Sequence, residues 1–339
     1  MKRGKIYMGS IFLLMAMFLI PLSYLLPESA MAADPPIKLK VLSSWSPEYL
    51  YIKEWLIPYI QRLNQKSGGR LQVSWVGPEA VPPFEQLKPL SAGLFDILFT
   101  HSAYHMGEVA VGVGLDLIKA TPSERRAIGF YELLDEAYKK VNARVLGLSY
   151  GAVGYHFILK KELPKADFTG LKLRTSPFYD PMVNALGGAT VRIAPGEIYS
   201  SLEKGVVDGA AWPVLGALDY KWYEVANFQL RPQFGEVIEL LLVNLGTWNK
   251  MPKDLQNLIT QITKEMEEDG YKALTAKVKG EEQKLVNLGM KLNVLPPAEG
   301  EKLLKTYYER TLEGIVMKHS PDFGPKMKKL ADDFVKKSK

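Results

Sequence analysis

Residues 168–213 read FTGLKLRTSPFYDPMVNALGGATVRIAPGEIYSSLEKGVVDGAAWP, and the pattern of this stretch decides the fold class. Short apolar or β-branched runs alternate with segments that have helical spacing and end at glycine. The predicted strands are 171–176, 189–194 and 206–213, and the predicted helices between them are 176–188 and 195–205. Strands that alternate with helices predict an α/β unit with a mainly parallel sheet.

The residues before this stretch repeat the alternation and predict a second α/β unit. The predicted strands there are 37–44, 70–76, 95–100 and 143–150, and the predicted helices are 48–67 and 123–143. Further along, residues 252–289 form a long amphipathic helical pattern in which Gly270 and Gly280 are points where the helix can bend. The chain is therefore expected to cross between two α/β lobes more than once, which is the layout of a hinged binding protein.

The first 32 residues have the features of a secretory signal peptide. A basic start, MKRGK, precedes an uncharged apolar stretch at 11–26 and the small-x-small sequence AMA at 30–32. We expect cleavage before Ala33 and export of the mature protein to the periplasm. An uncleaved membrane anchor is the alternative, but Pro21 interrupts the apolar stretch, which is slightly short for a span.

Composition excludes several classes of function. The formal net charge of the whole chain is +6, and the charges are interspersed, whereas nucleic-acid-binding proteins concentrate basic residues in patches. The chain has no cysteine, so disulfides, cysteine-based metal sites and a lipid-bearing cysteine are excluded. No cofactor is expected.

Residues 147–151 read GLSYG and match G-x-S-x-G, the pattern of the nucleophile elbow in serine hydrolases. An elbow requires a helix directly after the serine, but residues 154–161, GYHFILKK, are aromatic and β-branched and predict another strand. An exported serine hydrolase based on Ser149 therefore remains only an alternative, and the protein is not expected to be an enzyme. The glycines of this segment permit a bend between two domains.

Within residues 168–213 the sequence resembles the extracytoplasmic solute-binding proteins of TRAP transporters, the DctP-like family. The matching elements, in the order that the family shows, are GLKLR at 170–174, LGG at 186–188, EIY with Leu202 at 197–202, and GVVDG at 205–209. The resemblance implies a two-lobe periplasmic-binding-protein architecture with a hinge and a long lobe-spanning helix. The expected first lobe is 33–153 with 241–280, and the expected second lobe is 154–240 with 281–339.

The resemblance also implies a function. Such proteins capture a small organic acid in the cleft between the lobes, close around it and deliver it to the membrane permease subunits of the transporter; most look monomeric. A periplasmic ligand sensor for a membrane receptor would use the same closure and stays open as an alternative. The sequence does not identify the ligand.

Arg174 is the main candidate for contact with the ligand, because it ends a predicted strand, where α/β folds bind ligands. In the family the matching arginine pairs with the ligand carboxylate, which suits the paired donors of a planar guanidinium. Many relatives carry a second arginine near the position of Tyr155 or His156, and an amide where Trp212 stands. These departures predict a monocarboxylate with an apolar or aromatic body, although core packing is the other interpretation of Trp212.

The loops after the first-lobe strands are expected to form the opposite wall of the cleft. Each of their residues has capping or packing as an equal alternative. The spacing of His101 and His105 resembles a metal site, but no H-E-x-x-H is present and no metal is expected. With Arg174, Tyr155 and Trp212, the predicted ligand-contacting residues are Trp45, Ser46, His101, Tyr104, Ser176 and Pro195.

Overall fold

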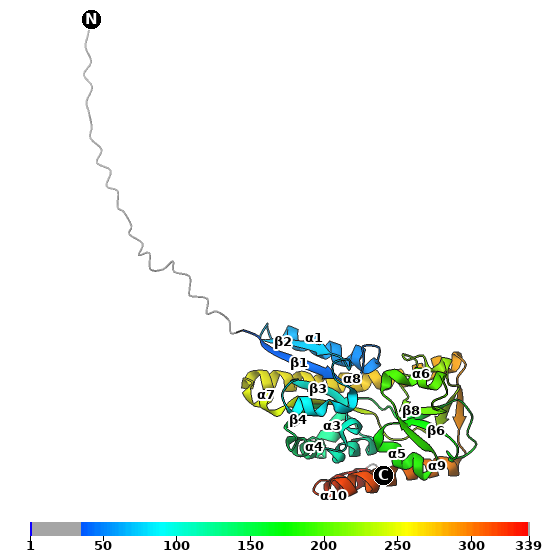
Figure 1. Ribbon diagram of the computed structural model, residues 1–339. Helices are drawn as coiled ribbons and strands as arrows, with labels where there is room; N and C mark the ends of the chain where they lie inside the picture. Colours follow the sequence, from blue (N-terminus) through cyan, green and yellow to red (C-terminus); the bar gives the residue numbers. More distant parts are fainter. Residues whose placement is uncertain (2–34, 338–339) are drawn as a thin grey trace. The chain divides into compact units, whose positions relative to one another are not determined.

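The computed structural model in Figure 1 describes Met1 and residues 35–337 of the 339-residue chain. The predicted signal peptide, apart from Met1, lies outside these described residues. From Pro36 onward the chain forms one unit that contains two sheets, as the two-lobe architecture requires.

The first sheet has the strand order β2-β1-β3-β10-β4. Its strands are β1 (Ile37–Ser43), β2 (Leu71–Val76), β3 (Ile97–His101), β4 (Ala143–Tyr150) and β10 (Ile238–Asn244). β1 pairs in parallel with β2 and β3, whereas β10 is antiparallel to β3 and β4. In this register Glu239 of β10 lies opposite His101 on one side and Ser149 on the other.

The second sheet has the strand order β11-β9-β5-β8-β6-β7. Its strands are β5 (Tyr155–Leu159), β6 (Lys172–Thr175), β7 (Ala189–Arg192), β8 (Gly209–Pro213), β9 (Phe228–Arg231) and β11 (Lys291–Val294). β5 is antiparallel to both of its neighbours, and the other pairs are parallel. The sheets are thus mainly parallel, as expected, with one reversed strand in each.

The chain crosses between the sheets three times, and its first two crossings enter the two reversed strands. β4 of the first sheet leads into β5 of the second, and β9 of the second leads back into β10 of the first. After α8 the chain returns to the second sheet as β11. These crossings confirm the expected layout, while the residue boundaries between the lobes stay a prediction.

Several helices are shorter than the sequence predicts, because their first turns are 3₁₀ or π, or because glycine interrupts them. The predicted helix 123–143 divides at Gly129, whose φ is 82°. Its first part begins at the capping box of Thr121 and Glu124, two residues before the predicted start. The shorter helical elements are η2 (Ile52–Leu56), α1 (Ile57–Lys66), η3 (Pro83–Glu85), α2 (Leu87–Ser91), η4 (Ser102–His105), η5 (Ala110–Leu117), α3 (Pro122–Ala127), α4 (Phe130–Lys139), η6 (Pro177–Tyr179), α5 (Asp180–Ala185), η7 (Pro195–Glu197), α6 (Ile198–Glu203), η8 (Trp222–Glu224), α7 (Leu245–Lys250), α9 (Pro297–Thr311), η9 (Leu312–Met317) and α10 (Gly324–Lys337).

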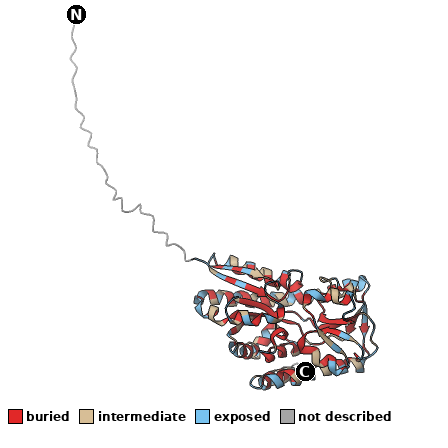
Figure 2. Cartoon of the chain, in the orientation of Figure 1, coloured by how far each residue is buried: buried red, intermediate tan, exposed pale blue. Residues whose placement is uncertain are grey.

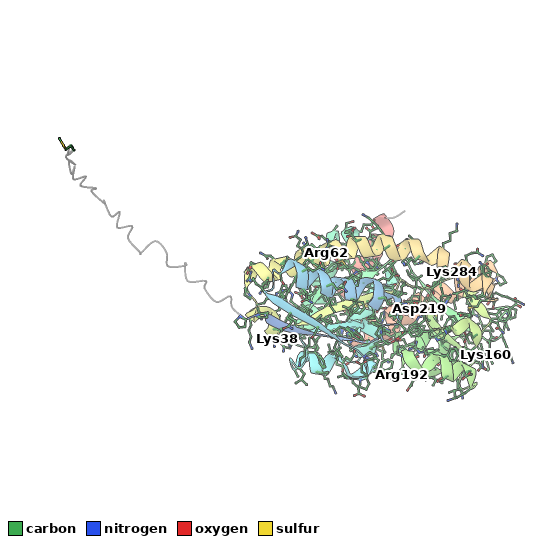
Figure 3. The ribbon with its side chains drawn as sticks, turned by 90° about the horizontal axis from the view of Figure 1, so that it is seen from above. Lys38, Arg62, Lys160, Arg192, Asp219 and Lys284 are labelled. Atoms are coloured by element: carbon green, nitrogen blue, oxygen red, sulfur yellow. The ribbon has the colours of Figure 1, made fainter. Side chains whose placement is uncertain are left out.

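The long helix α8 (Lys253–Asn287) contacts both lobes, which confirms the lobe-spanning helix. Glu267 accepts a hydrogen bond from the backbone N–H of Leu148 in β4, at 2.6 Å. About four turns later, Glu281 accepts from the backbone N–H of Gly216, just after β8, at 2.7 Å. The helix appears in yellow in Figure 3, where it extends past Arg62 of α1 and carries Lys284. The helix α8 is continuous through Gly270 and Gly280, the two points where the sequence allows a bend.

Most strand residues are buried, and the core runs through both sheets (Figure 2). The C-terminal helix α10 packs against α4 and η5, beside the first sheet. Within the part of the chain that the structure describes, no helix combines the length and apolar character needed to cross a membrane.

Candidate ligand-binding site

A cavity is lined by residues of both lobes, and the space between their atoms, open solvent included, is about 290 Å³. Its first-lobe wall comes from the segment after β1, from β3 and η4, and from β10. Its second-lobe wall comes from β5, from the end of β6 with η6, and from β8. The lining residues are Trp45, Tyr49, His101, Tyr104, Tyr155, Arg174, Ser176, Phe178, Tyr179, Trp212, Pro213, Val237 and Glu239.

Most residues predicted from the sequence to contact a ligand lie on this cavity: Trp45, His101, Tyr104, Tyr155, Arg174, Ser176 and Trp212. Ser46 and Pro195 instead line a neighbouring cavity, which Trp45 also borders. The indole of Trp45 therefore belongs to the walls of both cavities.

Arg174 is held by backbone carbonyls and has no acidic partner. Its Nε donates to the carbonyl of Ile193 at 3.0 Å, and its Nη1 donates to the carbonyl of Ala211 at 3.3 Å. The side chain is buried, its Nη2 has no hydrogen-bond partner, and no carboxylate of the described residues forms an ion pair with it. A buried charge is costly unless it is paired, so this guanidinium is suited to an anionic ligand.

Three further donors on the cavity have no hydrogen-bond partner: the indole N–H groups of Trp45 and Trp212 and the hydroxyl of Ser176. Burial raises the pKa of Tyr104 to about 12, although Arg174 and Trp45 act in the opposite direction. Since buried polar groups are normally paired, these donors are free to meet ligand oxygens.

Aromatic rings make up most of the remaining wall. In the first lobe, Trp45 lies 5.2 Å from Tyr49 and 5.6 Å from Tyr104, measured between ring centroids. In the second lobe, Phe178 lies 4.4 Å from Tyr179. The guanidinium carbon of Arg174 lies 5.2 Å from the centre of the Trp212 ring, within the range of a cation–π contact. The cavity therefore combines one cation with apolar faces.

Glu239 is a buried carboxyl on the cavity that the sequence analysis did not single out. One of its oxygens, Oε1, accepts from the hydroxyl of Tyr49 at 3.0 Å, and the other has no partner. Burial raises the pKa of Glu239 to about 8, against smaller lowering effects of His101 and Tyr49. A glutamate within an otherwise apolar strand was the available signal, because charged residues are seldom fully buried without a reason.

A hydrogen-bond network joins the lobes beside the cavity. The hydroxyl of Tyr155, in the second lobe, lies 2.9 Å from Nε2 of His101 and 2.9 Å from Oδ2 of Asp116, both in the first lobe. His101 Nε2 is also 3.0 Å from Asp116, and Nδ1 accepts from the N–H of Ala103. Burial lowers the pKa of His101, but Asp116 outweighs it and the net pKa is raised. With Nδ1 accepting, the ring in this arrangement carries its proton on Nε2.

The structure separates Tyr155 from His156, the two positions considered for the missing second arginine. Successive residues of a strand face opposite sides of the sheet. Tyr155 lines the cavity, whereas Nδ1 of His156 lies 2.7 Å from Arg231. Tyr155 therefore occupies the cavity side, without a positive charge.

Ser149 does not stand in a nucleophile elbow. It is buried in β4, its hydroxyl has no hydrogen-bond partner, and the next element is strand β5 rather than a helix. Nε2 of His105 is hydrogen-bonded to the hydroxyl of Tyr138, at 2.7 Å. The described residues include no group of three or more acidic or histidine side chains placed to hold a metal ion.

The chain is similar to known proteins over most of its length. Residues 41–311 match the model of the family "Bacterial extracellular solute-binding protein, family 7" (DctP). A monocarboxylate 2-oxoacid-binding periplasmic protein of Nostoc sp. is 28% identical over 255 residues, which cover 70% of this chain and 68% of the relative.

Two solved structures show the same fold. One is a TRAP periplasmic solute-binding protein from Desulfovibrio salexigens with bound orotic acid, which matches with a TM-score of 0.78 at 17% identity. The match covers 88% of this chain and 98% of the Desulfovibrio salexigens chain. A TRAP transporter solute-binding protein from Bordetella bronchiseptica, with copurified calcium and picolinate, has a TM-score of 0.77 at 22% identity, over 88% and 93% of the two chains.

Proposed function

The chain belongs to the bacterial extracellular solute-binding proteins of family 7, and from that premise we propose that it binds an organic monocarboxylate with an aromatic or apolar body. The ligand would lie in the cavity between the lobes, with its carboxylate on Arg174. The protein would capture it in the periplasm and deliver it to the membrane permease subunits of a TRAP transporter.

The observation that carries this proposal is the state of Arg174. A buried guanidinium that faces a cavity without an acidic partner is unfavourable until an anion arrives. Because two of its nitrogens are fixed by backbone carbonyls, its orientation is set before binding, which lowers the entropic cost of recognition.

Preference for one carboxylate follows from the charges on the lining. Among the described residues that line the cavity, Arg174 is the one arginine or lysine, and the rest of the wall is largely aromatic. A second ligand carboxylate would be desolvated without a paired cation. The names of three relatives record 2-oxoacid monocarboxylates, orotic acid and picolinate, whereas two others record C4-dicarboxylates and malonate, so the preference rests on the lining of this cavity.

The test is calorimetric titration of the purified mature protein with benzoate, picolinate, orotate, pyruvate and, as dicarboxylates, malonate and succinate. Arg174→Gln should abolish measurable binding of the monocarboxylates. Arg192→Gln is the matched control: this arginine lies on the adjacent strand β7 and is largely exposed (labelled in Figure 3), so binding should persist. In thermal unfolding, a ligand at 100 times its Kd should stabilise the wild type by about 2.7 kcal/mol.

Three outcomes would contradict the proposal. Binding of dicarboxylates alone would show that a second cation, not counted in the cavity, takes part in recognition. Unchanged binding by Arg174→Gln would remove the guanidinium from the site. Turnover of an ester, lost on Ser149→Ala, would instead favour the hydrolase alternative.

A further inference from the structure

Glu239 places an acidic side chain with an unpartnered oxygen on the same cavity as Arg174, and from it we propose that the ligand is a zwitterion. Its carboxylate would pair with Arg174, and a positively charged nitrogen group on the same molecule would lie against Glu239 among the aromatic rings. This inference rests on the proposed function of the same cavity and specifies the class of monocarboxylate.

The first step is that Glu239 has no cationic partner within the protein. No arginine or lysine of the described residues forms an ion pair with it, and Arg174, on the same cavity, is not within ion-pair distance. The side chain is 1% exposed, and Oε2 makes no hydrogen bond. An acidic and a basic side chain thus line one small cavity without pairing with each other.

The second step is that histidine does not fill this role. His101 lies opposite Glu239 in the sheet register, but both of its ring nitrogens are occupied. Nε2 faces Asp116 and the Tyr155 hydroxyl, and Nδ1 accepts from a backbone N–H. The imidazole therefore affects Glu239 only through space, and Oε2 is left for a ligand.

The aromatic wall around Glu239 suits a cation with a large apolar surface. The ring of Tyr49, whose hydroxyl holds Glu239, lies 5.2 Å from Trp45 and 5.8 Å from Trp212. Electron-rich ring faces attract ammonium groups, most strongly where water is excluded. A carboxylate beside such rings is suited to a substituted ammonium or a protonated ring nitrogen.

The affinity for a ligand whose cationic group lies against Glu239 should depend on pH. With a pKa of about 8, Glu239 holds a proton at neutral pH in the empty cavity, and a ligand cation would favour its release. The other titratable groups that act on it are Tyr49, Tyr51, Tyr104, Tyr155, His101 and Asp116. Burial raises the pKa of each of the four tyrosines, so none of these phenols ionises between pH 6 and 8.

The experiment compares ligands that differ in one charge. Glycine betaine and 3,3-dimethylbutanoate have the same shape and carboxylate, but the first has a quaternary nitrogen where the second has carbon. Phenylalanine and 3-phenylpropanoate form a second pair with an aromatic body. Each is titrated calorimetrically into the wild type and Glu239→Gln at pH 6, 7 and 8, after treatment with a chelator and again with added calcium.

We expect the zwitterionic member of at least one pair to bind the wild type tenfold or more tightly than its anionic analogue at pH 8. For glycine betaine, which does not titrate in this range, the affinity should rise severalfold from pH 6 to pH 8. Glu239→Gln should lose the preference and the rise in affinity due to Glu239, so that any pH dependence left belongs to His101, whose pKa is raised by Asp116. The variant should keep its affinity for the anionic member, which also shows that it is folded.

Other outcomes separate the two proposals. Equal or tighter binding of the anionic analogues, still abolished by Arg174→Gln, would overturn the zwitterion and leave the monocarboxylate function standing. Binding that requires calcium would assign Glu239 to a metal ion rather than to the ligand's nitrogen. Failure of all four ligands, together with the monocarboxylates above, would overturn both proposals.

Discussion

At the scale of the residue, the buried carboxyl of Glu239 should make the empty protein less stable as the pH rises. Its pKa of about 8 in the folded protein exceeds the ordinary value of 4.5. A carboxyl whose folded pKa is raised stabilises the folded state at low pH, and that contribution is lost between about 4.5 and 8.

Glu239→Gln removes this titration but keeps an oxygen that accepts from Tyr49. The variant should therefore be more stable than the wild type at pH 8, on the order of a few kcal/mol, with little difference near pH 4.5. Denaturant unfolding of both proteins across this pH range, without ligand, measures the difference. A difference that does not change with pH would show that Glu239 has the same pKa in the folded and unfolded states, and would contradict the raised pKa.

Arg174 and Glu239, the basic and the acidic side chain on the cavity that lack an ion-pair partner among the described residues, also show what single residues reveal in a sequence. Arg174 was predicted because it ends a strand and matches a family motif. Glu239 was not, because a glutamate in GEVIELLLVN looks the same whether its strand faces solvent or a cavity. Tyr49 and Tyr179 were missed for a similar reason: aromatic residues beside a helix start are as common in a core as in a binding site.

At the scale of the element, α8 offers two glycines in different surroundings. A Cβ added at Gly270 would lie 2.6 Å from Cδ1 of Trp55, whereas one added at Gly280 would meet nothing within 4 Å. Trp55 cannot shift easily, because its Nε1 donates to the carbonyl of Met266 and its ring stacks on Tyr59.

Gly280→Ala should therefore stabilise the protein by about 0.5–1 kcal/mol, since alanine favours a helix over glycine. Gly270→Ala should destabilise it by about 1–3 kcal/mol, because overpacking outweighs the same propensity gain. Chemical denaturation of the two variants gives the comparison. Equal stabilisation by both would mean that the helix or Trp55 moves to make room.

Sequence periodicity located most of the elements but not their exact form. The strands at 37–43 and 143–150 were predicted almost to the residue, because buried strands between polar turns have a clear pattern. The break at Gly129 was missed, since a glycine inside an amphipathic pattern is often tolerated. The reversed directions of β5 and β10 were missed too, because pairing direction depends on long-range topology that periodicity does not record.

At the scale of the whole molecule, the network around Tyr155 is a contact between the lobes that any opening must break. His101 and Asp116 are hydrogen-bonded to each other, and both precede the first crossing of the chain between the sheets, so we expect them to move together. Only the hydroxyl of Tyr155 reaches them from β5, with 2.9 Å to each. This hydroxyl therefore stabilises the closed arrangement over an open one.

Tyr155→Phe should weaken closure without changing which ligands are preferred. A hydrogen bond to a charged group contributes about 1.5–3 kcal/mol, so ligand dissociation should accelerate roughly tenfold or more, by the same factor for every carboxylate. Tyr179→Phe is the matched control, since that phenol also lines the cavity but donates to the carbonyl of Ala211 within its own lobe, at 3.1 Å. Dissociation is followed by stopped-flow fluorescence of the tryptophans on the cavity. Equal acceleration in both variants, or a factor that differs between ligands, would mean that the Tyr155 hydroxyl acts on the ligand rather than on closure.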